Sequence, residues 1–202
     1  GGGAGLLMKI PHGFFRKVME EAFSHKGHKE HKERNKNFCE LCDLCGQEND
    51  FGVAMIFGGE GEEAAIEGVV KAEGCKVLGW RDVPVNPDAI GRDARKVMPR
   101  IRQCFIATKD TKSAKESGGK EDSSFERRLY VIRRQIEKAT KKTYVCSCSA
   151  RTIVYKGLLL ADQVGVYYLD LDDQRCVSAI GLVHQRFSTN TFPEWPLAHP
   201  YR

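Results

Sequence analysis

The sequence lacks a long apolar run, and it has few aromatic residues and little excess charge. Its longest apolar stretch is Val53–Phe57, whereas a membrane-spanning helix needs about 20 such residues, so no membrane anchor is expected. Aromatic residues are 9% of the chain, and the net charge is +5 from 32 basic and 27 acidic residues. These charges are interspersed rather than gathered into a basic patch, so no nucleic-acid partner is expected.

The start of the chain also lacks an initiator methionine and a signal-type apolar segment. Both ends interrupt patterned segments, so we expect the sequence to be a fragment. Cysteine accounts for 8 of the 202 residues, with no targeting signal. That usage is too sparse for a disulfide scaffold and predicts a reducing, cytoplasmic location.

Several signatures of well-known enzyme classes are missing. There is no dinucleotide-binding Gly-x-Gly-x-x-Gly, no phosphate-binding Gly-Lys-Ser/Thr and no Gly-x-Ser-x-Gly nucleophile turn. The isolated histidines His12, His184 and His199 are expected to be structural rather than catalytic. Cysteines that lie alone in apolar runs, such as Cys104 and Cys146, are expected to be buried and inert.

Three segments have the apolar spacing of amphipathic helices. They are residues 11–23, 62–73 and 125–140. Pro11 suits a first helical turn, and Gly74 suits a C-terminal cap. Gly68 weakens the second helix by about 1 kcal/mol relative to alanine.

Runs rich in Val, Ile, Tyr and Phe predict strands between these helices. The predicted strands are Phe51–Phe57, Lys76–Val85, Ile101–Ala107, Tyr144–Ser149, Ile153–Leu160 and Cys176–His184. The runs around Tyr144 and Val154 are so close that they predict an antiparallel hairpin across Ala150–Arg151. The fold class expected is α+β, with antiparallel strands and helices covering a sheet face. Two polar stretches, 24–37 and 109–124, are expected to be exposed loops.

A cluster of possible metal ligands lies in and after the first polar stretch. Thiolates and imidazoles are the usual ligands of zinc, and a two-residue gap lets one turn present two sulfurs. Zinc sites typically use two separated ligand pairs, however, whereas this cluster has two evenly spaced triplets, so a solvated loop is the favoured interpretation and no metal site is predicted. The triplets are Cys39, Cys42 and Cys45, and His25, His28 and His31.

The segment after the last predicted strand is rich in polar side chains. Arg186, Ser188 and Thr189 follow the apolar run Cys176–Val183. An arginine beside hydroxyl groups would suit a small carboxylate, because its planar fork donates two parallel hydrogen bonds. An ordinary strand-to-loop transition explains the same residues equally well.

Residues 184–191 (HQRFSTNT) and 195–200 (WPLAHP) resemble the glutamine-binding segment of the class II glutamine amidotransferase domain of glutamate synthases. Further stretches resemble that family in the same order along the chain. They are Gly3–His12, Phe51–Met55, Gly79–Val85, Phe125–Leu129 and Arg151–Gly157.

The resemblance implies an αββα sandwich of the N-terminal-nucleophile hydrolase type, incomplete at both ends. Residues 1–202 would form part of that domain, with inserted loops at 24–50 and 109–124. The implied reaction hydrolyses L-glutamine to glutamate and ammonia, and the ammonia serves the reductive amination of 2-oxoglutarate. Arg186 would hold the glutamine α-carboxylate, and Phe187, Ser188 and Thr189 would line the same pocket.

The resemblance also implies groups that this chain does not carry. The nucleophilic cysteine and the Asn-Gly oxyanion hole are expected outside it, so no catalytic residue is assigned within it. FMN and an iron–sulfur cluster are expected in other domains of the parent enzyme, with electrons from a small donor subunit or ferredoxin, in the cytoplasm or a plastid. The alternative is a non-catalytic amino-acid-binding module that has lost its nucleophile, with or without an inserted zinc-binding knuckle.

Overall fold

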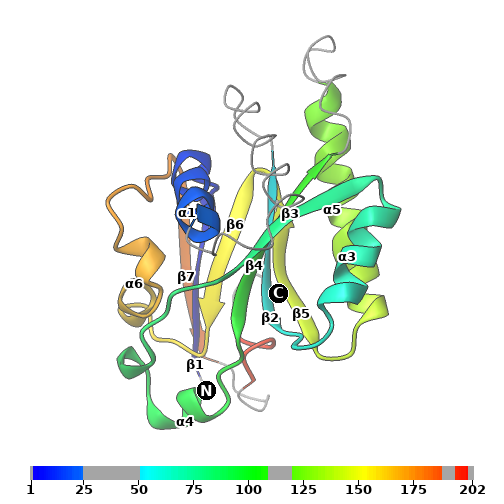
Figure 1. Cartoon of the computed structure of the whole chain (residues 1–202). Helices are drawn as coiled ribbons and strands as arrows, with labels where there is room; N and C mark the ends of the chain where they lie inside the picture. Colours follow the sequence, from blue (N-terminus) through cyan, green and yellow to red (C-terminus); the bar gives the residue numbers. More distant parts are fainter. Residues whose placement is uncertain (1, 25–50, 109–119, 188–193, 200–202) are drawn as a thin grey trace.

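The computed structural model describes residues 2–24, 51–108, 120–187 and 194–199 (Figure 1). The described chain has an α+β architecture with two antiparallel sheets, which confirms the fold class predicted from the sequence. Its elements in chain order are β1 (Gly2–Lys9), α1 (His12–Ser24), β2 (Gly52–Gly58), α3 (Glu63–Ala72), β3 (Cys75–Asp82), η1 (Pro87–Ala89), α4 (Arg92–Lys96), β4 (Ile101–Thr108), α5 (Lys120–Ala139), β5 (Thr143–Ser149), β6 (Thr152–Gly157), α6 (Gln163–Tyr167), η2 (Leu169–Leu171) and β7 (Gly181–Phe187).

The smaller sheet has the strand order β6-β1-β7, so the first strand of the chain lies at its centre. Both neighbours run antiparallel to β1: Gly5 is opposite Lys156 on β6 and opposite His184 on β7. Every residue of β7 is exposed, whereas most of β6 is buried. The partners of β1 therefore come from the last third of the chain.

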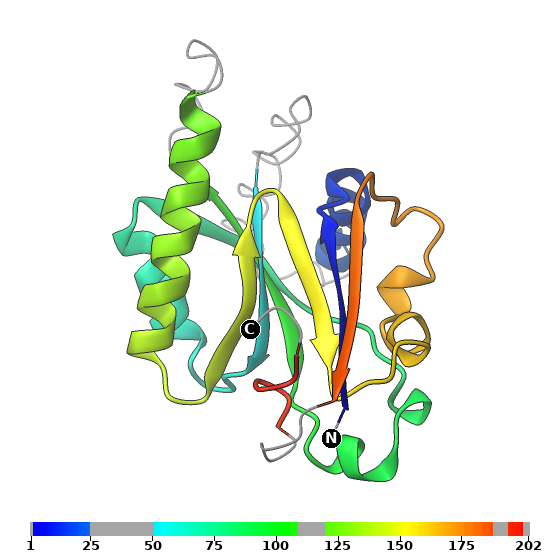
Figure 2. The same cartoon turned by 180° about the vertical axis from the view of Figure 1, so that it is seen from behind.

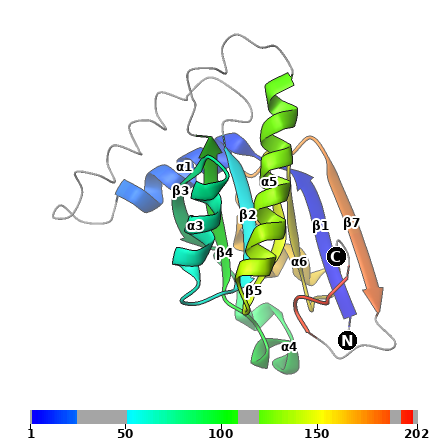
Figure 3. The same cartoon turned by 90° about the vertical axis from the view of Figure 1, so that its right-hand side faces the viewer.

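The larger sheet has the strand order β3-β4-β2-β5 and separates two hydrophobic cores. Side chains alternate across a strand, and β2 contributes Val53, Met55 and Phe57 to one core and Ala54 and Ile56 to the other. Helices α3 and α5 cover the face that carries Ala54 and Ile56 (Figure 3). The apolar stripe predicted for each of these helices is therefore the surface that contacts the sheet.

The other core joins the two sheets to helix α1. Phe15 on α1 lies with its ring centroid 5.8 Å from that of Phe105 on β4, and Phe51 lies 5.9 Å from the same ring. Met8 on β1 and Tyr155 on β6 belong to this core as well. Burial of these aromatic side chains holds the smaller sheet against the larger one.

The three predicted helices are present, but the third begins earlier than predicted. Helices α1 and α3 match the predicted ranges 11–23 and 62–73 closely. Gly74 follows α3 with a φ of +72°, the left-handed conformation that glycine tolerates best. Helix α5 begins at Lys120, so residues 120–124 are helical and their assignment to a loop is wrong.

The predicted hairpin across Ala150–Arg151 is also wrong, because β5 and β6 belong to different sheets. The hydroxyl of Ser149 accepts hydrogen bonds from the backbone N–H groups of Arg151 and Thr152, which turns the chain sharply. Side chains then take the place of backbone partners between the strands: the Val154 N–H donates to Ser147 Oγ. The two strands diverge, and each pairs with a strand far away in the sequence.

The last strand is shifted relative to the prediction Cys176–His184. Strand β7 spans Gly181–Phe187, and the hydroxyl of Ser178 lies 3.0 Å from the carbonyl oxygen of Lys9, a backbone group that a strand would otherwise pair with. Such local side-chain bonds compete with sheet pairing. The shift places Arg186 and Phe187 inside the strand rather than in the loop after it.

Some sequence predictions lie outside the described residues. These include Cys39, Cys42 and Cys45, which were considered as possible zinc ligands, and most of the predicted inserted loops. Over the ranges that the structure describes, no group of three or more His, Cys, Asp or Glu side chains is arranged to hold a metal ion. Within the same ranges, no helix is long and apolar enough to cross a membrane.

Candidate functional site

Arg186 lies near the end of β7, directly across from Gly3 on β1. Phe187 is opposite Gly2 in the same register, and its side chain is exposed. Arg186 is exposed too. Two of the four predicted glutamine-binding residues therefore lie beside the start of the chain. The other two, Ser188 and Thr189, lie outside the described residues.

The segment Glu194–His199 lies close to the start of β1 and the end of β6 (Figure 2). It forms a turn in which the N–H groups of Leu197 and Ala198 donate to the carbonyl oxygens of Glu194 and Trp195. Trp195 is 1% exposed, and its indole N–H donates to the carbonyl oxygen of Ala94 over 3.0 Å. The tryptophan side chain thus fixes this turn to the protein interior.

Gly157, the last residue of β6, makes room for the Trp195 ring. A Cβ atom built on Gly157 would lie 2.3 Å from the nearest ring carbon, closer than real contacts allow. The same indole has its ring centroid 5.6 Å from Tyr167 and 6.1 Å from Phe57. Only a residue without a side chain permits this approach of ring and backbone.

Gly3 on the neighbouring strand β1 likewise makes room for a close contact, here with the backbone of His199. A Cβ atom on Gly3 would lie 2.3 Å from the carbonyl oxygen and 2.8 Å from the backbone nitrogen of His199. The backbone of His199 therefore lies directly against β1 at the position opposite Arg186. His199 contributes main-chain atoms to this contact.

Lys156 is fully buried and was not singled out from the sequence. Its Nζ lies 2.9 Å from the hydroxyl of Tyr144, 3.2 Å from the carbonyl oxygen of Pro196 and 3.0 Å from that of Ala198. The sequence carried a signal for this residue, because Lys156 interrupts an apolar strand run. A charged side chain is rarely buried in such a run unless hydrogen-bond acceptors or an opposite charge surround it. The start of β1, the end of β7, Lys156 and the turn at Trp195 thus form one cluster, which we call the β1 end cluster.

A second polar group, a largely buried ion pair, lies beside Phe14 and Val18 of helix α1. Arg81 on β3 donates two hydrogen bonds of 2.8 and 2.6 Å to Asp170 on η2, and Tyr155 on β6 donates a third of 3.1 Å to the same carboxylate. Arg81 also donates to Gln103 on β4. Burial and the nearby negative charge of Asp170 raise the pKa of Tyr155 well above its usual range. This phenol therefore remains protonated at neutral pH and acts as a donor.

Four of the five cysteines in the described segments are poor nucleophiles. Burial raises the pKa of the Cys146 and Cys148 thiols to about 12, and that of half-buried Cys176 to about 11. Cys104 is shifted in the same direction by its complete burial. A thiol reacts as its thiolate, so these residues fit the inert role that was predicted from their apolar surroundings.

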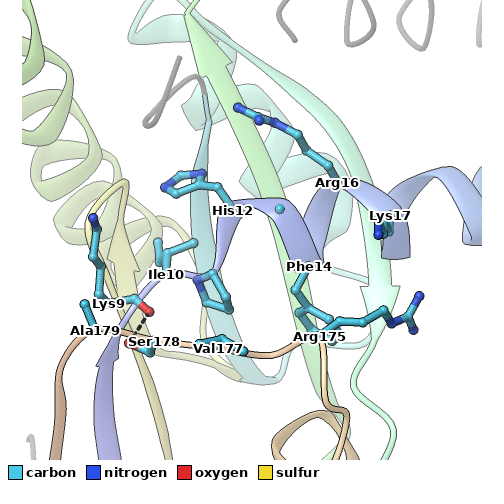
Figure 4. Close-up of a pocket in the computed structure, with 12 residues that line it drawn as sticks. Lys9, Ile10, His12, Phe14, Arg16, Lys17, Arg175, Val177, Ser178 and Ala179 are labelled. Atoms are coloured by element: carbon cyan, nitrogen blue, oxygen red, sulfur yellow. Dashed lines mark hydrogen bonds between the residues drawn. The ribbon is translucent and has the colours of Figure 1, made fainter. Parts of the chain in front are cut away.

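A pocket of about 520 Å³ lies at the opposite end of β1, around the start of helix α1 (Figure 4). His12 lines it, with Nε2 2.9 Å from the carbonyl oxygen of Ala150 and the ring edge against Phe51. The charged ends of Lys9, Arg16 and Arg175 point away from one another in Figure 4. These cations do not converge on one ligand position, so the β1 end cluster remains the stronger candidate site.

Comparison with known proteins places the chain in a family. The whole chain, residues 1–202, matches the class-II glutamine amidotransferases, and the chain belongs to this family. The family resemblance noted from the sequence motifs is therefore confirmed.

The relatives that the chain is similar to are much longer proteins. It is 43% identical over 212 residues to the glutamate synthase [NADPH] large chain of Bacillus subtilis, and 36% identical over 214 residues to that of Azospirillum brasilense. Each alignment covers 100% of this chain and 12% of the relative. The chloroplastic ferredoxin-dependent glutamate synthase of Oryza sativa is 43% identical over 163 residues, covering 75% of this chain and 10% of that protein.

Proposed function

We propose that this chain is part of the glutaminase domain of a glutamate synthase. The full-length protein would hydrolyse L-glutamine to glutamate and ammonia and use the ammonia to aminate 2-oxoglutarate reductively. The observation that supports this most directly is the position of Arg186 opposite Gly3, beside the backbone of His199, in a chain that matches the family along its whole length. In such a domain the two sheets would become the inner layers of an αββα sandwich.

Arg186 would hold the glutamine α-carboxylate through two coplanar N–H donors. Phe187 would provide an apolar wall, and Ser188 and Thr189 would add hydroxyl groups. Substrate held at its α-carbon end extends its side-chain amide away from the guanidinium. Binding there orients the amide, and orientation contributes to rate as well as to affinity.

The nucleophilic cysteine, its α-amine base and the Asn-Gly oxyanion hole are proposed to lie in the rest of the full-length protein. FMN and an iron–sulfur cluster are proposed to lie there too, together with the contact to a donor subunit or ferredoxin. The described cysteines do not fit a cluster, because no three metal-ligand side chains converge within the described ranges. We place the protein in the cytoplasm or, like relatives named as chloroplastic, in a plastid.

The test is glutamate formation from glutamine by the full-length protein and by its Arg186→Lys variant. Loss of a charge-assisted contact to a bound carboxylate is worth roughly 1.5–3 kcal/mol, about ten- to 150-fold in the specificity constant. We expect most of this loss in KM, because the α-carboxylate is remote from the reacting amide. The matched control is Arg134→Lys on the exposed face of α5, where Arg134 pairs only with Glu137 among the described residues.

Two results would contradict the proposal. Unchanged KM and kcat in Arg186→Lys would remove the carboxylate assignment. Binding of glutamine by the wild-type protein without hydrolysis would favour the alternative, a binding module that has lost its nucleophile.

A further inference from the structure

Lys156 and Gly157 hold the turn at Trp195 from opposite sides of one strand. Consecutive residues of a strand face opposite ways, and here the first reaches the carbonyl oxygens of Pro196 and Ala198 while the second receives the indole ring of Trp195. The turn is therefore fixed at its backbone and at its side chain by neighbouring residues of β6.

The backbone contact depends on a buried amine. Lys156 is 0% exposed, and Tyr144 on β5 adds its hydroxyl at 2.9 Å to the two carbonyl oxygens. The Tyr144 ring lies on the same amine, with its centroid 4.8 Å from Nζ. An amine taken out of water is tolerated only where such oxygens replace the lost solvent, so the position of the turn and the position of Nζ determine each other.

The turn leads directly to the contact between His199 and Gly3. Ala198, whose carbonyl oxygen Lys156 binds, is the residue before His199, whose backbone lies against Gly3. Gly3 in turn is opposite Arg186. A displacement at the Lys156 amine would therefore pass along a single peptide unit to the main chain that borders the Arg186 end of the sheet.

We propose that Lys156 is a positioning residue for glutamine hydrolysis: through the carbonyl oxygens of Pro196 and Ala198 it sets where the main chain at His199 lies relative to Gly3 and Arg186. This inference rests on the proposed glutaminase function. Lys156 acts through the turn and not on the substrate, so its removal affects the geometry of bound glutamine more than its binding. Small displacements of this kind lower turnover.

The test compares glutamine hydrolysis by the full-length wild-type protein with Lys156→Met and Lys156→Arg, well below the melting temperature of each. Methionine fills a similar volume and donates no hydrogen bond, and we expect kcat/KM to fall about tenfold or more, mainly through kcat. Arginine keeps a cation for the same oxygens, but its larger head displaces the turn, and we expect a smaller fall, again in kcat. If Lys156→Met does not fold, Lys156→Arg decides the question.

The matched control is Ile153→Val, a buried position on the same strand that does not contact the turn in any described interaction. It should lower the melting temperature and leave kcat and KM unchanged. Unchanged kcat and KM in the folded Lys156 variants, with an active wild type, would overturn the positioning role alone. An equal loss of kcat in Ile153→Val would overturn it as well. A wild-type protein that does not hydrolyse glutamine would overturn both this inference and the proposed function.

Discussion

Arg81 and Asp170 form a bidentate ion pair that joins β3 of the larger sheet to the 3₁₀ turn η2 after β6. Their side chains are only 13% and 1% exposed, and the two hydrogen bonds are 2.8 and 2.6 Å long. Tyr155 binds the same carboxylate from the smaller sheet. The pair therefore joins three parts of the core at one carboxylate.

We expect Asp170→Asn to be strongly destabilising. The substitution leaves the Arg81 guanidinium in the interior without its counter-charge, and breaking a buried pair in this way typically costs about 3–5 kcal/mol. The free energy of unfolding, measured by urea titration, checks this.

The matched control is Asp88→Asn, which breaks the pair between Asp88 and Arg95. Those side chains are 86% and 44% exposed, and exposed pairs contribute about 0–1 kcal/mol. If Asp170→Asn and Asp88→Asn lowered the free energy of unfolding equally, the buried pair would stabilise the fold no more than an exposed one.

Two glycine substitutions should have opposite effects on stability. Gly157→Ala places a methyl group against the Trp195 ring, and overpacking of this kind costs about 1–3 kcal/mol. Gly68→Ala lies within α3, where a Cβ meets nothing within 4 Å, and should stabilise the protein by about 0.5–1 kcal/mol. The melting temperatures of the two variants check both predictions. A higher melting temperature in Gly157→Ala would contradict the packing described at the turn.

The buried thiols predict a loss of stability at alkaline pH. The pKa of Cys146 and that of Cys148 are raised from 9.0 to about 12 by burial, so the unfolded chain ionises first. The contribution of the two protonated thiols to the free energy of unfolding is fully present below pH 9. It is lost between about pH 9 and 12, at about 1.4 kcal/mol per pH unit for each thiol. Urea unfolding at pH 8 and pH 10 with a reductant present measures it.

Cys146→Ala is the control for this alkaline loss. It should remove one thiol's share of the pH dependence, although it also changes core packing. An identical slope in the variant and the wild type would show that Cys146 ionises no later in the folded protein than in the unfolded chain.

The elements with strong local patterns were predicted well from the sequence, and those defined by distant contacts were not. The stripe Leu129, Ile132 and Ile136 identified α5, because helical spacing is a local property. The relation of β5 to β6 was missed because the hydroxyls of Ser147 and Ser149 redirect the chain between two sheets. Serine in a short connection looks the same in sequence whether it closes a hairpin or prevents one.

In the candidate site, too, local motifs were predicted from the sequence and distant contacts were not. The motif around Arg186 was recognised from its residues, and its position opposite Gly3 follows from the register of β7 on β1. Lys156 was missed because its partners are the main-chain carbonyls of Pro196 and Ala198, and main-chain atoms leave no trace in a residue pattern. Asp170, between Leu169 and Leu171, carried a weak signal as an acidic residue in an apolar run.

The central place of β1 has a consequence for how the protein is made. A ribosome adds about 5–20 residues per second, so the strand Gly2–Lys9 leaves it well before its neighbours Thr152–Gly157 and Gly181–Phe187 exist. Closing so long a loop is slow, and the smaller sheet must assemble late in synthesis, after the segments of the larger sheet have emerged. Until then both edges of strand β1 are open to pairing with other chains.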